Sequence, residues 1–142
     1  MEKKILQARI LIVDDQDVMV SLLEQMLRTA HYACVSSTLI SSEVAALHEA
    51  NHYDLILLDI QMPDMDGFEV MEQLRKCEPS GTLPVLVISA QPNHKPRAIR
   101  SGANDFISKP FDVPEILSRV HNMLESRLLG AWSRGPALVL TS

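Results

Sequence analysis

Three short runs of almost uninterrupted apolar residues constrain the fold of this chain more than any other feature. They are RILIV at 9–13, DLILL at 54–58 and LPVLVIS at 83–89. A strand with no alternation of apolar and polar residues is buried on both faces, which is typical of a parallel sheet covered by helices on both sides. Two weaker runs, YACVSS at 32–37 and DFIS at 105–108, complete the set of predicted strands.

The segments between these runs have helical periodicity. Residues 17–30 place four apolar side chains at intervals of four, and we expect them to form the buried face of a helix: Val18, Leu22, Met26 and Ala30. Further helices are predicted at 40–50 (Ile40, Val44 and Leu47 apolar), at 67–77 (Phe68, Met71 and Leu74 apolar), from Pro96 to Gly102, and from Val113 to about Leu129, with Asp112 and Glu115 spaced as a capping box. Strands and helices alternate, and right-handed crossovers then give a doubly wound α/β sheet.

The composition indicates one ordinary globular domain. The 142 residues are 46% hydrophobic and 22% charged, and the net charge of −5 provides no basic face for nucleic acid or membranes. The N-terminal stretch is too interrupted for a signal peptide, and no apolar run approaches the roughly 20 residues of a membrane span. Cys34 and Cys77 lack disulfide or metal spacing, and we expect reduced, mostly buried thiols in a cytoplasmic protein.

Polar side chains stand at the ends of the predicted strands. Asp14 and Asp15 follow the first strand, Asp59 and Ser89 end the third and the fourth, and the fifth leads into Lys109. In a doubly wound sheet the carboxyl ends of the parallel strands meet at one edge, and the functional crevice lies there. The sequence therefore predicts that three carboxylates, a hydroxyl and an ammonium share one crevice.

This set of groups predicts a bound cation and an anion that binds beside it. Three carboxylates close together repel one another unless a positive charge intervenes. Mg²⁺ suits the position, because it uses one or two carboxylates together with water. Lys109 and Ser89 would then face an incoming anion, and a phosphoryl group fits that description. Each residue alone has a simpler explanation, since an Asp after a strand is usually a helix cap and a lone Lys is usually solvated.

Other conspicuous residues are explained more simply by structure. HEANH at 48–52 matches the spacing of zinc-protease ligands, but the next predicted strand begins directly after it, so we expect the helix to have ended there. Asp64 and Asp66 are expected to be turn or cap residues. The remaining histidines show no ligand spacing and are expected at the surface: His31, His94 and His121.

At these strand ends the chain resembles the receiver domain of bacterial two-component response regulators. The matching strings, in the family's order, are LIVDD (11–15), DLILLDIQMPDMDGFE (54–69), LPVLVISA (83–90) and SGANDFISKPF (101–111). The resemblance covers residues 8 to about 126. It implies a (βα)5 three-layer sandwich whose five-stranded parallel sheet has the flavodoxin-like order 2-1-3-4-5.

The resemblance also implies roles for the residues at the sheet edge. Asp59 would be the phospho-acceptor, forming 4-aspartylphosphate in a reaction that needs Mg²⁺ or Mn²⁺. Asp14, Asp15, Asp59 and the backbone carbonyl of Gln61 would bind the metal, Asp14 largely through a water molecule. Lys109 would pair with the phosphoryl oxygens.

A conformational switch belongs to the same expectation. Ser89 would hydrogen-bond the phosphoryl group and move toward it, and Phe106 would turn inward as Ser89 moves. The peptide bond between Lys109 and Pro110 would be cis, an isomer that lies only about 0.5–1 kcal/mol above trans before proline.

Three features depart from the family pattern. Phe106 stands where Tyr is also frequent, and without a hydroxyl its inward and outward states differ by packing alone. Gln61 and Gln91 lie two residues after Asp59 and Ser89, beside the path of the attacking water in the family, so they would tune dephosphorylation. The segment 89–102 is about two residues shorter than usual and contains Pro92 and Pro96. This predicts a rebuilt loop and a truncated fourth helix.

The implied function is signalling. The domain would accept a phosphoryl group from a phosphohistidine on a sensor histidine kinase or a histidine phosphotransfer protein, and would control an output domain or an effector protein. A second copy of the domain is a further candidate partner. The chain would assist its own phosphorylation and dephosphorylation without being a turnover enzyme.

Two alternatives remain from the sequence. One is a true enzyme with an aspartyl nucleophile, but such enzymes need a general acid two residues later, and the Gln61 amide has no titrating proton to offer. The other is an interaction module with a vestigial acidic crevice, which binding of Mg²⁺ would exclude.

The chain divides into an N-terminal extension (1–7), the receiver domain (8–126) and a C-terminal extension (127–142). The last segment continues the final helix and ends in GAWSRGPALVLTS, with Trp132 and an apolar run at 137–140. It is too short for a second domain. We expect either a lead into an output domain or a tail that packs on itself or on a partner.

Overall fold

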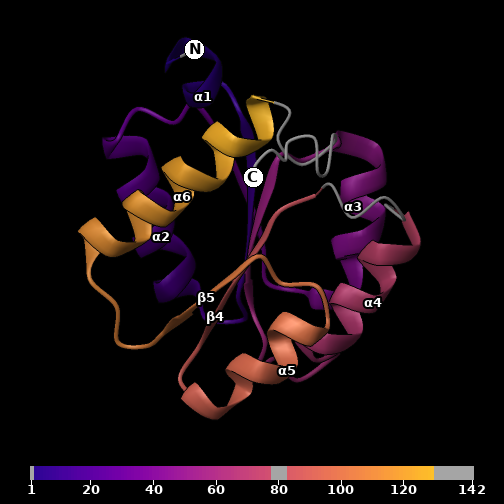
Figure 1. The fold of residues 1–142 in the computed structure, drawn as a ribbon. Coiled ribbons are helices and arrows are strands. Elements are labelled where there is room, and N and C mark those ends of the chain that lie inside the picture. Colours follow the sequence, from indigo (N-terminus) through magenta and orange to yellow (C-terminus); the bar gives the residue numbers. More distant parts are fainter. Residues whose placement is uncertain (1, 78–82, 130–142) are drawn as a thin grey trace, which may run out of the picture.

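A five-stranded parallel sheet lies between two layers of helices in the computed structural model, which describes residues 2–77 and 83–129 (Figure 1). The strands are β1 (Arg9–Val13), β2 (Cys34–Thr38), β3 (Leu55–Asp59), β4 (Val85–Ser89) and β5 (Asp105–Ser108). Their order is β2-β1-β3-β4-β5, and every neighbouring pair is parallel. The predicted doubly wound, flavodoxin-like sheet is therefore confirmed.

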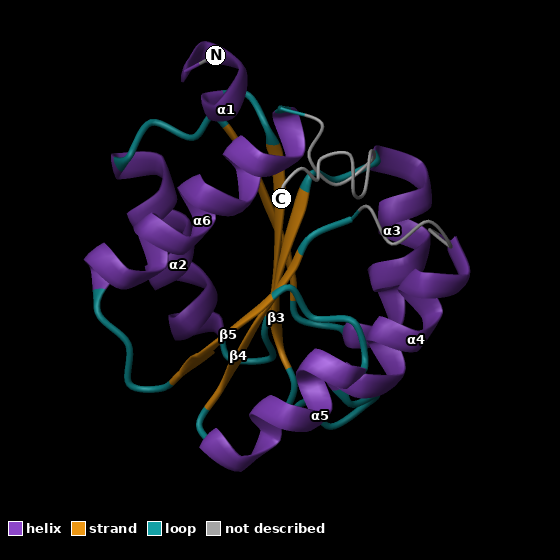
Figure 2. Cartoon of the chain, in the orientation of Figure 1, coloured by secondary structure: helices purple, strands orange, loops and turns teal. Residues whose placement is uncertain are grey.

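Helices cover both faces of this sheet (Figure 2). One layer contains α1 (Glu2–Leu6), α2 (Asp17–Thr29) and α6 (Val113–Leu128), and the other contains α3 (Val44–Asn51), α4 (Gly67–Cys77) and α5 (Lys95–Arg100). Two 3-10 turns, η1 (Ser41–Glu43) and η2 (Pro92–His94), lead directly into α3 and α5. The helix α1 was not predicted, since residues 1–7 were expected to be only an extension.

Successive residues of each central strand enter different hydrophobic cores. In β1, Ile10 and Ile12 pack with α2 and α6, while Leu11 and Val13 pack with the layer of α3, α4 and α5. Because side chains alternate across a strand, a strand that is apolar at every position must be covered on both faces. The same alternation in β3 and β4 explains why the three strong apolar runs predicted the sheet correctly.

The helix α2 buries a different face from the one predicted. Val20, Leu23 and Leu27 lie in the core, whereas Val18 is 81% exposed. Residues spaced strictly by four drift around a helix by about 40° at each step, while the spacing of three and four keeps one face toward the sheet. Of the predicted set, only Met26 is buried in the core.

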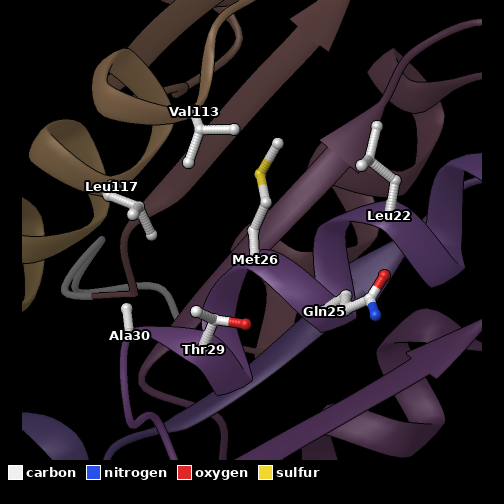
Figure 3. A pocket seen from close by; sticks show the side chains of 7 residues that line it. All are labelled: Leu22, Gln25, Met26, Thr29, Ala30, Val113 and Leu117. Carbon is white, nitrogen blue, oxygen red and sulfur yellow. The ribbon is translucent and has the colours of Figure 1, made fainter.

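The predicted face of α2 instead borders an apolar groove. Leu22, Met26 and Ala30 line it together with Val113 and Leu117 of α6, and its volume is about 370 Å³. Figure 3 shows Met26 between the two α6 side chains and Leu22. In the part of the chain that the structure describes, the side chains that line this groove include no acid, base or thiol, and none of them belongs to the predicted crevice.

The remaining expectations differ from the structure in detail. The helix predicted from Pro96 to Gly102 is α5. It is short as predicted, but it begins at Lys95 with Pro96 in its first turn. Cys34 lies at the start of an edge strand and is exposed, so the expectation of buried thiols was wrong for it.

Among the described residues, no helix is both long and apolar enough to cross a bilayer. The predicted behaviour of the tail GAWSRGPALVLTS concerns residues outside the described ranges.

Candidate acidic site at the carboxyl edge of the sheet

Three carboxylates meet where β1 and β3 end. Asp14 and Asp15 directly follow β1, and Asp59 is the last residue of β3. The register pairs Val13 with Leu58, which brings the residues after each to the same level of the sheet. One oxygen of each carboxylate lies within 4.8 Å of the others. The three carboxylates therefore lie close together at one edge of the sheet, as predicted.

Lys109 reaches this cluster from the end of β5. Its Nζ lies 3.3 Å from Oδ2 of Asp59 and 3.6 Å from Oδ2 of Asp14. Its backbone N–H donates to the carbonyl of Ser89 at 2.8 Å, which ties this loop to the end of β4. The peptide bond between Lys109 and Pro110 is cis, as predicted.

Asp59 is 6% exposed and both of its oxygens have partners. Oδ1 accepts a hydrogen bond from the backbone N–H of Gln61 at 2.9 Å, and Oδ2 faces Lys109. These two contacts fix the orientation of the Asp59 carboxylate at the carboxyl edge of the sheet. The role of the Gln61 carbonyl as a metal ligand stays a prediction.

The charge of Asp14 is unfavourable in the folded protein without a cation. Burial raises the pKa of its carboxyl, and the neighbouring Asp59 and Asp15 raise it further. The N–H of Gln16, which donates to Asp14 at 3.0 Å, and the ammonium of Lys109 act in the opposite direction. One lysine against three carboxylates leaves the cluster with excess negative charge.

These donors fit a small hard cation. The cluster offers carboxylate oxygens at close range from two strand ends, and Mg²⁺ or Mn²⁺ prefers such oxygen ligands together with water. The nitrogen and sulfur donors typical of zinc are not part of it. His48, in the formal zinc pattern, is buried with Nδ1 accepting from the N–H of Tyr53, and His52 has left-handed backbone geometry after the helix end. The helix therefore ends before His52, as expected, and the two histidines do not share a helical face as the zinc-protease pattern requires.

The loop after β3 is built from caps. Asp64 accepts from the Ser41 hydroxyl at 2.7 Å and from the N–H of Ser42 at 3.0 Å, which caps the η1 turn. Asp66 accepts from the N–H of Glu69 at 3.0 Å and caps α4. Both aspartates are therefore cap residues, as predicted, and stand apart from the acidic cluster.

The two predicted switch residues lie in the neighbouring strands. Ser89 ends β4 and is fully buried, and Phe106 in β5 pairs with Val87 and is 6% exposed. The Phe106 ring belongs to the core beneath α3, α4 and α5. Ser89 Oγ accepts from the N–H of Gln91 at 3.0 Å and lies 3.1 Å from Nδ1 of His94.

His94 is the residue of this region that sequence reasoning missed. It was expected at the surface, but it is only partly exposed and contacts Ser89 and Phe68. No ligand spacing in the sequence identifies it. The relevant signal is its place in the short, proline-bounded segment after Ser89, where a tight turn brings the chain back toward β4.

Comparison with known proteins agrees with this geometry. The family model described as the response regulator receiver domain matches residues 10–121. The chain is 37% identical over 126 residues to the response regulator PleD of Caulobacter vibrioides, covering 87% of this chain and 28% of PleD. It is 39% identical over 118 residues to the DNA-binding dual master transcriptional regulator RpaA of Synechocystis, covering 82% of this chain and 48% of RpaA. The chain thus spans less than half of each of these relatives.

Solved structures show the same relationship. A putative response regulator from Chloroflexus aurantiacus is 33% identical with a TM-score of 0.78, and the match covers 84% of this chain and 98% of that one. A CheY-like receiver domain protein from Methanospirillum hungatei is 27% identical with a TM-score of 0.77, covering 85% and 96%. The matched region contains the strand ends that form the acidic cluster, and the chain therefore belongs to the receiver-domain family of two-component response regulators.

Proposed function

We propose that Asp59 accepts a phosphoryl group from a phosphohistidine of a sensor histidine kinase or histidine phosphotransfer protein. The observation that supports this most directly is the place of the Asp59 carboxylate, 3.3 Å from the Lys109 ammonium and within 4.8 Å of Asp14 and Asp15. A nucleophile, a fixed cation and a set of metal ligands are the components that phosphoryl transfer requires.

The side chains divide the work of transfer between them. An Asp59 oxygen forms a bond to phosphorus while the bond from phosphorus to the donor imidazole nitrogen breaks, and the imidazole leaves with the electron pair. Lys109 lies where it can pair with a phosphoryl oxygen, since its Nζ already faces Asp59. Asp14, Asp15 and Asp59, with the Gln61 carbonyl, would hold Mg²⁺ or Mn²⁺. The bound metal would neutralise charge on the transferring group.

The product is an acyl phosphate that acts as a signal. Its formation would draw the Ser89 hydroxyl toward the phosphoryl group and bias a pre-existing conformational equilibrium in which Phe106 takes part. The readout would be an output domain or an effector protein in the cytoplasm. Residues 8–126 would form the receiver, and residues 127–142 would be either a lead into an output domain or a tail that packs on itself or on a partner. Gln61 has no acidic proton for a leaving group, which supports a phospho-acceptor rather than a turnover enzyme.

The assignment is tested by intact-mass measurement after incubation with acetyl phosphate and Mg²⁺. We expect one added phosphoryl group on the wild type and none on Asp59→Asn, and EDTA should abolish labelling of the wild type. The matched control is Asp105→Asn, at a carboxylate that pairs with Arg119 at 2.7 Å, and it should be labelled normally. Labelling of Asp59→Asn at the wild-type yield would refute the proposal.

A further inference from the structure

The Ser89 hydroxyl is already engaged in the structure. It is 0% exposed, its oxygen accepts from the N–H of Gln91 at 3.0 Å, and it lies 3.1 Å from Nδ1 of His94. Neither partner belongs to the acidic cluster. The hydroxyl that the proposed function needs at the phosphoryl group is therefore held by the chain segment that follows it.

Two elements fix the position of the His94 ring. Its residue closes the η2 turn, where its backbone N–H donates to the carbonyl of Gln91 at 3.0 Å. The imidazole packs edge-on against Phe68 at the start of α4, with ring centroids 5.8 Å apart at 88°. Arg97 of α5 covers the same Phe68 ring, with its guanidinium carbon 3.9 Å from the ring centroid. Nδ1 is therefore directed at Ser89 by packing as well as by the turn.

The hydrogen-bonding capacity of a hydroxyl makes this contact important. A serine hydroxyl has one proton, and phosphoryl oxygens are acceptors, so Ser89 can bind a phosphoryl group only by donating that proton. The N–H of Gln91 uses a lone pair of Oγ and leaves the proton available. A neutral imidazole whose Nδ1 is unprotonated accepts this proton, and it then competes directly with a phosphoryl oxygen.

We infer that His94 is a positioning residue that holds the Ser89 hydroxyl in its resting orientation, so that phosphoryl binding at Asp59 requires Ser89 to leave His94. The inference rests on the proposed function of Asp59. It goes beyond that function because it assigns a specific opposing contact to the shortened segment after β4. Loss of one hydrogen bond, at its usual net free energy, corresponds to about a two- to tenfold change in the equilibrium between the resting and the activated position of Ser89.

The competition between His94 and the phosphoryl group for the Ser89 hydroxyl can be measured as the affinity for beryllofluoride, a phosphoryl analogue, in the presence of Mg²⁺. His94→Phe keeps a ring against Phe68 but removes the nitrogen, so we expect binding about two- to tenfold tighter than wild type. His94→Asn places an amide where Nδ1 stood and should return the affinity toward the wild-type value. The control is His121→Phe on α6, another partly exposed histidine in the opposite helix layer, which should bind like the wild type. Unchanged or weaker binding by His94→Phe would overturn the inference.

A double-mutant cycle tests whether His94 acts through Ser89. In a Ser89→Ala background the substitution His94→Phe should have no further effect on beryllofluoride affinity, because the contact is already absent. A gain of the same size in that background would overturn the inference. Thermal unfolding of every variant shows whether each is folded under the conditions of the titration.

The imidazole nitrogens provide a readout that packing alone would not change. On saturation with beryllofluoride, the ¹⁵N resonance of His94 Nδ1 should move to the position that it has in Ser89→Ala. A resonance that stays unchanged at saturation would show that Ser89 remains on His94, and would overturn the inference while the proposed function stands. Failure of the wild type to bind beryllofluoride with Mg²⁺ would overturn the proposed function and this inference with it.

Discussion

Asp14 is the residue at which burial and charge oppose each other most directly. The residue is 2% exposed and has two carboxylate neighbours, and burial is the main reason for the raised pKa of its carboxyl. A carboxyl whose folded-state pKa is raised binds more protons folded than unfolded. Its contribution to stability is therefore lost as pH rises from the ordinary value of 3.8 through the raised pKa.

Asp14→Asn should therefore stabilise the metal-free protein at neutral pH. We expect an increase on the order of 1 kcal/mol in the free energy of unfolding, because the neutral amide removes a buried charge that the neighbouring carboxylates also repel. The measurement is urea unfolding in EDTA at pH 7 and at pH 3.5, and the gain should shrink at the lower pH. A variant that is less stable than the wild type at pH 7 would contradict this reasoning.

Gly67 is a second residue whose identity the structure explains. A Cβ added at this position would lie 2.6 Å from the Cα of Ile60, and the Gly67 N–H donates to the Ile60 carbonyl at 2.9 Å. The close approach joins the start of α4 to the residue that follows Asp59. Any side chain at position 67 must push the backbone of the loop that leaves the acidic site.

Gly67→Ala should lower the free energy of unfolding by about 1–3 kcal/mol, the usual range for overpacking at a tight site. It should also slow labelling by acetyl phosphate, because the loop after Asp59 shifts. Lys76→Ala, at an exposed position of the same helix, should change stability by less than about 0.5 kcal/mol. Chemical denaturation of both variants checks the difference, and equal stabilities would show that the loop accommodates the methyl group freely.

At the scale of elements, the loop between β3 and α4 connects three parts of the fold. Through Asp64 it caps the η1 turn before α3, and through Asp66 it caps α4. Asp64 has a lowered pKa, first because the Ser41 hydroxyl donates to its ionised carboxylate and then because the Ser42 N–H does so. The loop that leaves Asp59 is thereby anchored to its neighbours on both sides.

Removing the Asp64 charge should weaken this anchor in a pH-dependent manner. A lowered folded-state pKa means that the contribution is fully present above the ordinary value of 3.8 and is lost as pH falls below it. Asp64→Asn should therefore lower the urea midpoint at pH 7, and the difference from the wild type should narrow on acidification to pH 2.5. If the difference widens in acid, the carboxylate is not the stabilising form. In a Ser41→Ala background the effect of Asp64→Asn should be smaller, since one donor is gone.

At the scale of the whole molecule, the acidic cluster depends on the topology. Its ligands come from the ends of β1 and β3, and its lysine comes from beyond β5, so the cluster forms only when the sheet has formed. A cation that binds the cluster therefore binds the folded state in preference to the unfolded chain, and it must stabilise the fold by mass action.

Mg²⁺ should accordingly raise the stability of the whole domain. At a free concentration about a hundred times its dissociation constant, the expected gain is about 2.7 kcal/mol. In Asp15→Asn most of this Mg²⁺-dependent stabilisation should be lost, because the substitution removes the most accessible carboxylate of the cluster. Calorimetry in MgCl₂ and in NaCl of equal ionic strength distinguishes binding from screening. Identical melting temperatures in the two salts would argue against a metal site.

Much of the architecture follows from local sequence, because each central strand contributes side chains to both hydrophobic cores and must therefore be apolar at every position. An apolar run such as Ile10 to Val13 is stable only between two layers, and α4 and β5 have the bounds that their patterns predict. Caps such as Asp112, which accepts from the N–H of Glu115 at 2.9 Å, are equally local. These features depend on neighbours within a few residues, so the order of elements and the convergence of their polar ends could be predicted.

Only the tertiary structure decided the features that depend on contacts between distant elements. The buried face of α2 depends on how that helix lies on the sheet and beside α6, and spacing alone selected the wrong side chains. The place of His94 depends on Ser89 and Phe68, which lie on two other elements, so its exposure could not be read from its neighbours in sequence. The sequence by itself thus determined which groups gather at the sheet edge, and packing between elements decided which of them are held in place and by what.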